Sequence, residues 1–414
     1  MQLGRVTTAL GVALASTVLL AGCAGLEVHG GTGVSAATGA AAAASSAAPA
    51  APKLTVESPA SWKTPLTVTV ANATLTDVVV TDASSQDALM GAVAADGLSW
   101  TSTSLPASGA SYRVKATVTT AAGSSQLTAS AKVSTQPDSA KLKYGINPGS
   151  GATVGVNAPI VIRFTHPVTR PQDVENNLHV YSSTPVTGAW HWISSSEVHF
   201  RPETTWPTQT QVRVVASLKG VQLSDQRYGV KDGTADFTVG DSHVTIVDDK
   251  TKTVTILVNG KKTYTWPTSL GRPEFVTRSG NYIVLEKLPV REMTSCTAKI
   301  TCDKTSKDYY DLQVQWATRL SWSGTFIHAA PWSAAKQGLV DSSHGCIHLT
   351  IDRAKTYFDM AQYGDLVTVK NTGRPIDDLI SHGDPGASDW NSSWSSWVAG
   401  SALGSTVTTE PIPT

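Results

Sequence analysis

Apolar and polar residues alternate with a period of two along much of the middle of this chain. Alternation of this kind is typical of β-strands that bury one face and expose the other. The alternating apolar positions are Leu66, Val68, Val70, Tyr112, Val114, Ala116 and Val118, and later Ile160, Ile162, Phe164, Val212 and Val214. A faint internal repeat accompanies them, because Leu105-Pro106 and Trp206-Pro207 each lead within a few residues into an Arg-Val strand. The pattern predicts two duplicated β-sandwich modules, at residues 53–138 and 139–240.

Neither module shows a catalytic pattern. Their histidines are scattered, and each is predicted to be a strand-face or turn residue rather than a ligand. These residues are His166, His179, His191 and His199. The modules are therefore expected to act as spacers or as supports that contact a larger structure.

A third, β-rich domain is predicted at residues 241–371. Consecutive hairpins begin at His243, and Asn259-Gly260 between two apolar runs is the strongest short hairpin signal. Further strands are predicted at residues 280–285, 313–320, 325–328 and 366–369. A helix is predicted after Thr350, with apolar residues at helical spacing and Gly364 beyond its end.

The N-terminus predicts export. Arg5 precedes an apolar run at residues 6–20, which is the length of a signal-peptide core and too short for a membrane span. The run ends in Leu20-Ala21-Gly22-Cys23, which resembles a bacterial lipobox. We expect a signal peptide at residues 1–22 and a lipid anchor on Cys23, with an ordinary cleaved signal as the alternative. Residues 23–52 are mostly Ala, Gly, Ser and Pro and predict a flexible tether.

The balance of charge gives no general attraction for polyanionic partners. The chain has 32 Lys plus Arg and 32 Asp plus Glu, so no net field favours nucleic acid or an anionic surface. Only 15% of residues are charged and Trp reaches 12, a composition typical of extracellular β-rich proteins.

The cysteines point to one free thiol. Besides Cys23, the chain has Cys296, Cys302 and Cys346. In an oxidising exterior, Cys296 and Cys302 are close enough in sequence to form a disulfide, which leaves Cys346 unpaired. A pairing of Cys346 with either of the others remains open and would block its chemistry.

Cys346 lies in a motif suited to nucleophilic catalysis. It follows Ser343, His344 and Gly345, and His328 lies upstream on a separate predicted strand. A thiol needs a nearby base, and His328 is the candidate general base. Gly345 allows a tight bend, so the Gly345 and Cys346 amides are candidate oxyanion donors. His344 would either take part in catalysis or fix the loop by hydrogen bonds.

These residues resemble the signature of the L,D-transpeptidase catalytic domain, also called YkuD. The segments Trp316-Ala317-Thr318, residues 326–333 and Asp389-Trp390-Asn391 resemble the mycobacterial and actinobacterial branch of that family. Members of that branch are lipoproteins with two immunoglobulin-like modules before the transpeptidase domain. The resemblance implies a mainly β fold: two immunoglobulin-like β-sandwich modules, then a β-rich L,D-transpeptidase domain with one or two helices.

The resemblance also implies a reaction without a cofactor. Cys346 would attack a peptidoglycan stem tetrapeptide, release D-Ala and hold a thioester, which the amine of a second stem converts into a 3→3 crosslink. His328 would be the base, oriented by the backbone carbonyl of Ala329. The enzyme would be anchored at the cell membrane facing the cell wall and be inhibited by β-lactams of the carbapenem class.

Further positions take their predicted roles from the resemblance. Substrate contacts are expected at Ser343, His348, Trp322, Trp332 and Met293, where Met293 begins a lid that reaches residue 307. His348 departs from the family, which usually has Asn there. In the extension at residues 372–414, Trp390, Trp394 and Trp397 are expected to clasp the tail onto the catalytic domain.

Two other classes of function remain open. His328, His344, Cys346 and His348 are residue types that could bind Zn²⁺, as in a zinc-dependent wall hydrolase. The change at His348 would also suit a wall-binding lipoprotein whose catalysis has been altered.

Overall fold

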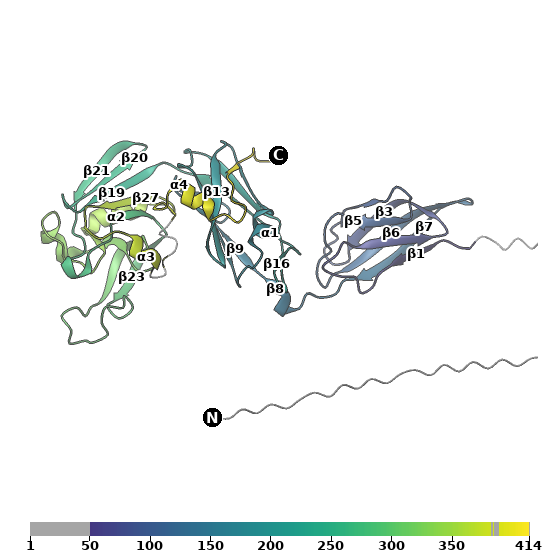
Figure 1. Cartoon of the computed structure of the whole chain (residues 1–414), viewed down its shortest axis with the longest axis horizontal. Coiled ribbons are helices and arrows are strands. Elements are labelled where there is room, and N and C mark those ends of the chain that lie inside the picture. Colours follow the sequence, from purple (N-terminus) through teal and green to yellow (C-terminus); the bar gives the residue numbers. More distant parts are fainter. Residues whose placement is uncertain (1–49, 382–383, 385–388, 414) are drawn as a thin grey trace, which may run out of the picture. The chain divides into compact units, whose positions relative to one another are not determined.

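The computed structural model describes residues 50–381, 384 and 389–413 (Figure 1). The predicted signal peptide, the anchor at Cys23 and nearly all of the tether lie outside the described residues. The remainder, residues 51–414, forms one compact unit. Within the described residues, no helix is long and apolar enough to cross a membrane.

The first module is a β-sandwich of the immunoglobulin-like type. Its strands are β1 (Lys53–Val56), β2 (Thr67–Ala71), β3 (Thr74–Asp82), β4 (Gly91–Val93), β5 (Ser99–Ser102), β6 (Ser111–Thr120) and β7 (Gly123–Lys132). One sheet has the order β1-β2-β5-β4 and the other β3-β6-β7. The alternating apolar side chains of β2 and β6 point inward, and Trp100 is buried among them. The period-two pattern therefore predicted the buried face correctly.

The second module is a larger sandwich. After the 3₁₀ turn η1 (Asp138–Ala140), it contains β8 (Lys141–Leu142), β9 (Tyr144–Asn147), β10 (Thr153–Val154), β11 (Ile160–Phe164), α1 (Pro171–Glu175), β12 (Leu178–Ser182), β13 (Thr187–Ser194), β14 (Glu197–Pro202), β15 (Gln211–Ala216), β16 (Gln222–Ser224), β17 (Arg227–Gly229) and β18 (Gly233–Val239). Its main sheets have the orders β10-β18-β15-β12 and β28-β13-β14-β11-β9, where β28 (Val407–Thr408) comes from the C-terminal extension. Phe200 and Trp206 fill the space between them.

The third domain contains the sheet that carries the motif. Its elements are β19 (His243–Asp248), β20 (Thr253–Val258), β21 (Lys261–Pro267), η2 (Pro273–Phe275), β22 (Gly280–Ile283), β23 (Glu286–Thr294), β24 (Asp311–Arg319), β25 (Phe326–Ala329), η3 (Pro331–Lys336), β26 (Ile347–Leu349), α2 (Ile351–Met360) and β27 (Leu366–Lys370). One sheet has the order β21-β20-β19-β27-β22 and the other β23-β24-β25-β26. The predicted hairpins and helix are present, although Thr350 makes no side-chain cap bond at the start of α2.

Helix α2 covers the second of these sheets. Its buried residues Ala354 and Tyr357 pack with Ile327, Ile347 and other apolar side chains of the third domain. Gly364 follows the helix with a φ of +86°, and a Cβ there would lie 2.3 Å from Ala158 of the second module. Only glycine permits this close approach, which joins the two domains.

The C-terminal extension packs on the third domain, where Ile376 and Leu379 join the core, and it also packs on the second module. It contains α3 (Asp377–Ser381), α4 (Trp394–Ala399) and β28 (Val407–Thr408). Helix α4 lies against β13, the Trp397 indole donates to the Ala189 carbonyl at 3.0 Å, and β28 pairs with β13. Near Asn391 the extension contacts the third domain, where Asn391 accepts from the Asn281 amide. The tail therefore joins both domains, because the indoles find buried acceptors on the second module.

His199 lies on strand β14, as the sequence predicted, and its side chain is buried in a polar site. It is 2% exposed and lies between two carboxylates, 2.9 Å from Asp389 and 2.7 Å from Glu197. Although burial opposes it, these carboxylates raise the pKa of His199 to about 9. The alternation of apolar and polar residues could not show that His199 pairs with Asp389, because the two residues are far apart in sequence.

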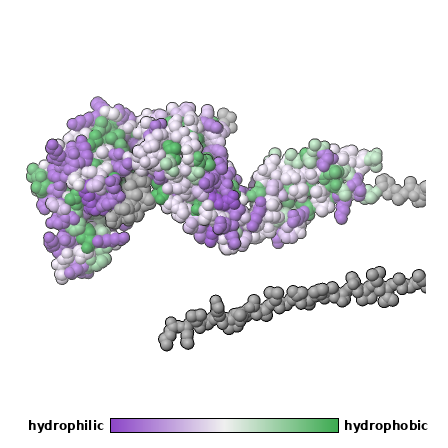
Figure 2. All heavy atoms as spheres, viewed as in Figure 1, coloured by the Kyte–Doolittle hydropathy of each residue, from purple (hydrophilic) through white to green (hydrophobic). Residues whose placement is uncertain are grey.

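The surface is mixed in polarity. On the face shown in Figure 2, hydrophobic residues form small groups among hydrophilic ones. Large exposed apolar side chains near the motif are Trp332, Leu339 and Val340.

Candidate active site

Strand pairing brings His328 and His348 together. Strands β25 and β26 are parallel, His328 pairs with His348, and their ring centroids are 4.8 Å apart. Ile327 and Ile347 point to the opposite face and are buried in the core. Residues two apart on an extended segment face the same side, so Cys346 lies on the same face as the two imidazoles.

The loop before Cys346 is held by Ser343. The Ser343 hydroxyl donates to the Cys346 carbonyl at 2.7 Å and accepts the Gly345 amide at 3.0 Å. Gly345 has a φ of +119°, which favours glycine. The bend agrees with expectation, but the Gly345 amide is occupied by Ser343. In this conformation it is not a donor for an oxyanion, contrary to the prediction.

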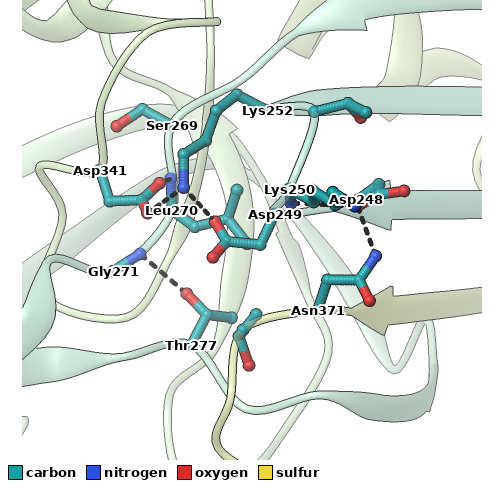
Figure 3. Close-up of polar contacts among 12 residues, drawn as sticks. Asp248, Asp249, Lys250, Lys252, Ser269, Leu270, Gly271, Thr277, Asp341 and Asn371 are labelled. Carbon is teal, nitrogen blue, oxygen red and sulfur yellow. Dashed lines mark hydrogen bonds and ion pairs between the residues drawn. The ribbon is translucent and has the colours of Figure 1, made fainter.

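A segment that the sequence did not single out supports this loop (Figure 3). The Leu270 carbonyl accepts the Ser342 and Ser343 amides at 3.0 Å each. Thr277 accepts the Gly271 amide at 2.9 Å and donates to the Gly345 carbonyl at 3.0 Å. Because backbone groups make most of these bonds, no side-chain signature in the sequence could reveal them.

A half-buried charge network fixes the start of the loop. The Asp341 carboxylate accepts the Leu270 amide at 2.9 Å and pairs with Lys252. The Lys252 ammonium also lies 2.6 Å from Asp249. Figure 3 shows Lys252 reaching between these carboxylates. The loop is thus tied to the β19–β20 hairpin.

The Cys346 thiol is unpaired and lies in an apolar environment. It packs against Val314, Ala317 and Phe326, and its Sγ is 3.7 Å from the Gly324 carbonyl. Burial raises the pKa of the Cys346 thiol to about 11, although the Phe326 amide opposes this. The thiol is therefore protonated at neutral pH and needs a base to become a nucleophile.

His328 has the features of such a base. It is 3% exposed, and its Nδ1 lies 2.9 Å from the Ala329 carbonyl. A carbonyl can only accept, so Nδ1 carries the proton and Nε2 carries the lone pair. Burial lowers the pKa of His328 to about 4, so the imidazole is neutral at pH 7. The contact with Ala329 is the one that the resemblance implied.

His344 is held by aromatic rings rather than by a hydrogen bond to the loop. The ring centroids of Phe275 and Tyr310 each lie 4.8 Å from that of His344. The Nε2 of His344 is buried without a partner in the described part of the chain. Burial, with a contribution from Arg272, lowers the pKa of His344. Neither aromatic residue was identified from the sequence, because Phe275 ends the short turn η2 and Tyr310 lies in a loop, and neither segment has a periodic pattern.

Of the other residues predicted to contact substrate, Trp332 and Met293 lie near the site and Trp322 lies elsewhere. Trp332 is 53% exposed, and its ring centroid lies 6.2 Å from that of His328 and 6.0 Å from that of His348. Met293 packs on the same apolar cluster as Cys346. Trp322 lies instead near Arg319 and lines a cavity of about 140 Å³ that also involves His199 and Asp389.

The predicted lid is braced by a disulfide. Cys296 and Cys302 are bonded, with their Cα atoms 4.4 Å apart. Just beyond the lid, Asp308 pairs with Arg272, and the Tyr310 ring packs against His344 with the two ring planes 43° apart.

Across the described residues, no group of three or more His, Cys, Asp or Glu side chains is arranged to hold a metal ion.

Two regions of the chain match known protein families, and the chain is similar to known L,D-transpeptidases. The family model of the L,D-transpeptidase catalytic domain matches residues 242–369, and that of a bacterial Ig domain matches residues 57–222. L,D-transpeptidase 2 of Mycobacterium tuberculosis is 33% identical over 338 residues, which span 82% of this chain and 81% of that protein. L,D-transpeptidase 1 of the same species is 35% identical and covers 54% of this chain and 83% of its own length. A solved LD transpeptidase in complex with imipenem is 35% identical, covers 55% of this chain and 97% of its own, and has a TM-score of 0.48.

Proposed function

The chain belongs to the L,D-transpeptidase family of peptidoglycan-crosslinking enzymes, and from this premise we propose that it forms 3→3 crosslinks through a Cys346 thioester. The observation that supports the proposal most is the neutral His328, fixed by the Ala329 carbonyl on the strand beside Cys346. The substrates would be stem tetrapeptides, with D-Ala as the leaving group.

In the first half-reaction, the Cys346 proton moves to His328 Nε2 as the sulfur attacks the carbonyl carbon. The C–N bond then breaks, and His328 returns the proton to the departing amine of D-Ala. The high thiol pKa and low imidazole pKa argue against a preformed ion pair. Proton transfer therefore accompanies attack, which keeps the resting thiol unreactive.

In the second half-reaction, the amine of another stem attacks the thioester. His328 Nε2 takes one amine proton, the C–S bond breaks, and the thiolate recovers that proton. Since the Gly345 amide is engaged by Ser343, the Cys346 amide is the remaining backbone donor proposed for the oxyanion.

The setting of the reaction is also part of the proposal. Export and anchoring through Cys23 would place the enzyme at the outer face of the membrane, beside its polymeric substrate. Carbapenems would acylate Cys346, which is supported by the imipenem complex of an LD transpeptidase 35% identical to this chain.

Intact-mass spectrometry of residues 51–414 with a disaccharide-tetrapeptide tests the proposal, with Cys346→Ala as control. The expected result is an adduct on Cys346, release of D-Ala and a crosslinked dimer, all absent from the control. A thiol that forms no adduct with the stem or with imipenem would refute it and favour the wall-binding alternative.

A further inference from the structure

The position of His348 beside the general base raises the question of what a second imidazole does there. Its Nδ1 lies 3.0 Å from the Ser333 hydroxyl, and that hydroxyl lies 3.0 Å from the Ala330 carbonyl. The hydroxyl has one hydrogen. Only if it donates to the carbonyl and accepts from His348 Nδ1–H do both contacts become hydrogen bonds.

His348 therefore carries its proton on Nδ1 and a lone pair on Nε2, as His328 does. Neither Nε2 has a hydrogen-bond partner among the described residues, and neither is fully sealed from solvent. Burial lowers the pKa of His348 well below its usual value, and the nearby His328 adds to the effect. The motif face thus presents two neutral nitrogen acceptors side by side.

This pair matches the chemistry of an attacking primary amine. A neutral amine has two N–H groups, of which one is surrendered to the general base and the other remains in the product amide. In a partly buried site, an N–H without an acceptor costs a substantial part of its hydrogen-bond energy. A second acceptor also fixes the rotation of the amine, so that its lone pair points at the thioester carbon.

We propose that His348 Nε2 accepts the retained N–H of the acceptor amine and so orients it for attack on the Cys346 thioester. The inference rests on the proposed transpeptidase function and adds to it a substrate-orienting residue for the second half-reaction. Ser333 acts through His348 as a positioning residue, because its hydroxyl selects the tautomer.

The test separates the two half-reactions. Acylation of Cys346 by imipenem or by a donor tetrapeptide involves no incoming amine. The acylation rate of His348→Ala should therefore stay within about twofold of the wild-type rate. Aminolysis of the acyl-enzyme by a primary amine acceptor should fall about tenfold, the effect of one hydrogen bond in the transition state. His179→Ala, on an exposed position of β12, is the matched control and should change neither rate.

A second acceptor sharpens the comparison. An N-methyl version of the same amine has a single N–H, which the general base consumes, so His348→Ala should leave its rate nearly unchanged. Equal losses for the primary and N-methyl amines, or equal losses in acylation and aminolysis, would overturn the proposal and make His348 a support for His328.

A spectroscopic readout is independent of turnover. Long-range ¹⁵N–¹H correlation spectra should show His348 protonated on Nδ1 at neutral pH, and Ser333→Ala should mix the tautomers and slow aminolysis a few-fold. A wild-type His348 protonated on Nε2 would overturn the inference. A wild-type enzyme without acyl-enzyme formation would instead overturn the proposed function first, so the two failures are distinguishable.

Discussion

Asp341 supports the nucleophile loop in two physically separable ways. Its Oδ1 accepts the amide of Leu270, which is 1% exposed, and its other oxygen pairs with Lys252. Asp341→Asn keeps an oxygen for the amide but removes the charge. Asp341→Ala removes both interactions, so the difference between the variants isolates the hydrogen bond.

The structure sets the expected magnitudes. The side chains of Lys252 and Asp341 are 20% and 15% exposed, and Lys252 keeps Asp249 at 2.6 Å after the change. Losing the Asp341 charge also relieves the repulsion that contributes to the raised pKa of Asp249. We therefore expect Asp341→Asn to cost at most about 1 kcal/mol. Asp341→Ala should cost roughly 1–3 kcal/mol more, because the buried Leu270 amide loses its acceptor.

Hydrogen exchange measured by mass spectrometry can report this locally, through peptides that span residues 268–272 and 341–348. Asp341→Ala should raise exchange in both peptides and slow acylation of Cys346 by imipenem, whereas Asp341→Asn should resemble the wild type in both. Lys252→Met is the matched control for the charge alone. If the Asn and Ala variants open the Leu270 amide equally, the hydrogen bond does not hold the loop and the reasoning fails.

Three further predictions concern other parts of the chain. Docking of the tail should depend on pH, because His199 pairs with Asp389 of the tail. The raised pKa of His199, about 9, gives a contribution that is complete below about pH 6.5 and is lost as the pH rises toward 9. Proteolysis of residues 389–410 should therefore accelerate above neutral pH in the wild type, and a His199→Gln variant that kept the same profile would contradict this. Tyr310→Ala should expose His344 and raise its pKa toward the usual value in an NMR titration, and Tyr310→Phe should not, because the ring contact provides the burial. Replacing Cys296 and Cys302 together by Ser should lower the free energy of local unfolding of the lid by about 2 kcal/mol in hydrogen exchange, and leave Cys346 as the site of imipenem acylation.

The sequence predicted what depends on short-range periodicity. Alternation at Val68 and Val70 and the Asn259-Gly260 turn follow from side-chain packing and local backbone preference, and the structure has strands and a hairpin there. The same holds for α2, whose apolar residues recur at helical spacing.

The sequence did not predict contacts made by backbone groups or by residues far apart. The amide partners of Leu270, the Tyr310 ring on His344 and the pairing of His199 with Asp389 depend on which loops the fold brings together. The motif also led us to predict that the Gly345 amide donates to an oxyanion. That prediction was wrong because the amide donates to the Ser343 hydroxyl, a contact that the sequence does not show. The hydroxyl of a motif serine competes with substrate for backbone donors, and the outcome depends on how the loop folds.

The electrostatics of the site favour a neutral resting state. Burial raises the pKa of Cys346 and lowers the pKa values of His328, His344 and His348, so every titratable group of the motif is uncharged at pH 7. A thiolate paired with an imidazolium would react with any oxidant that reached it, because the thiolate is the reactive form. A protonated thiol resists this oxidation, and it becomes reactive only when a carbonyl carbon is placed where attack and proton transfer can proceed together. The cost is a very small thiolate population, so the rate depends on positioning, to which the hydrogen bonds of Ser343, Thr277 and Asp341 in and around the loop contribute.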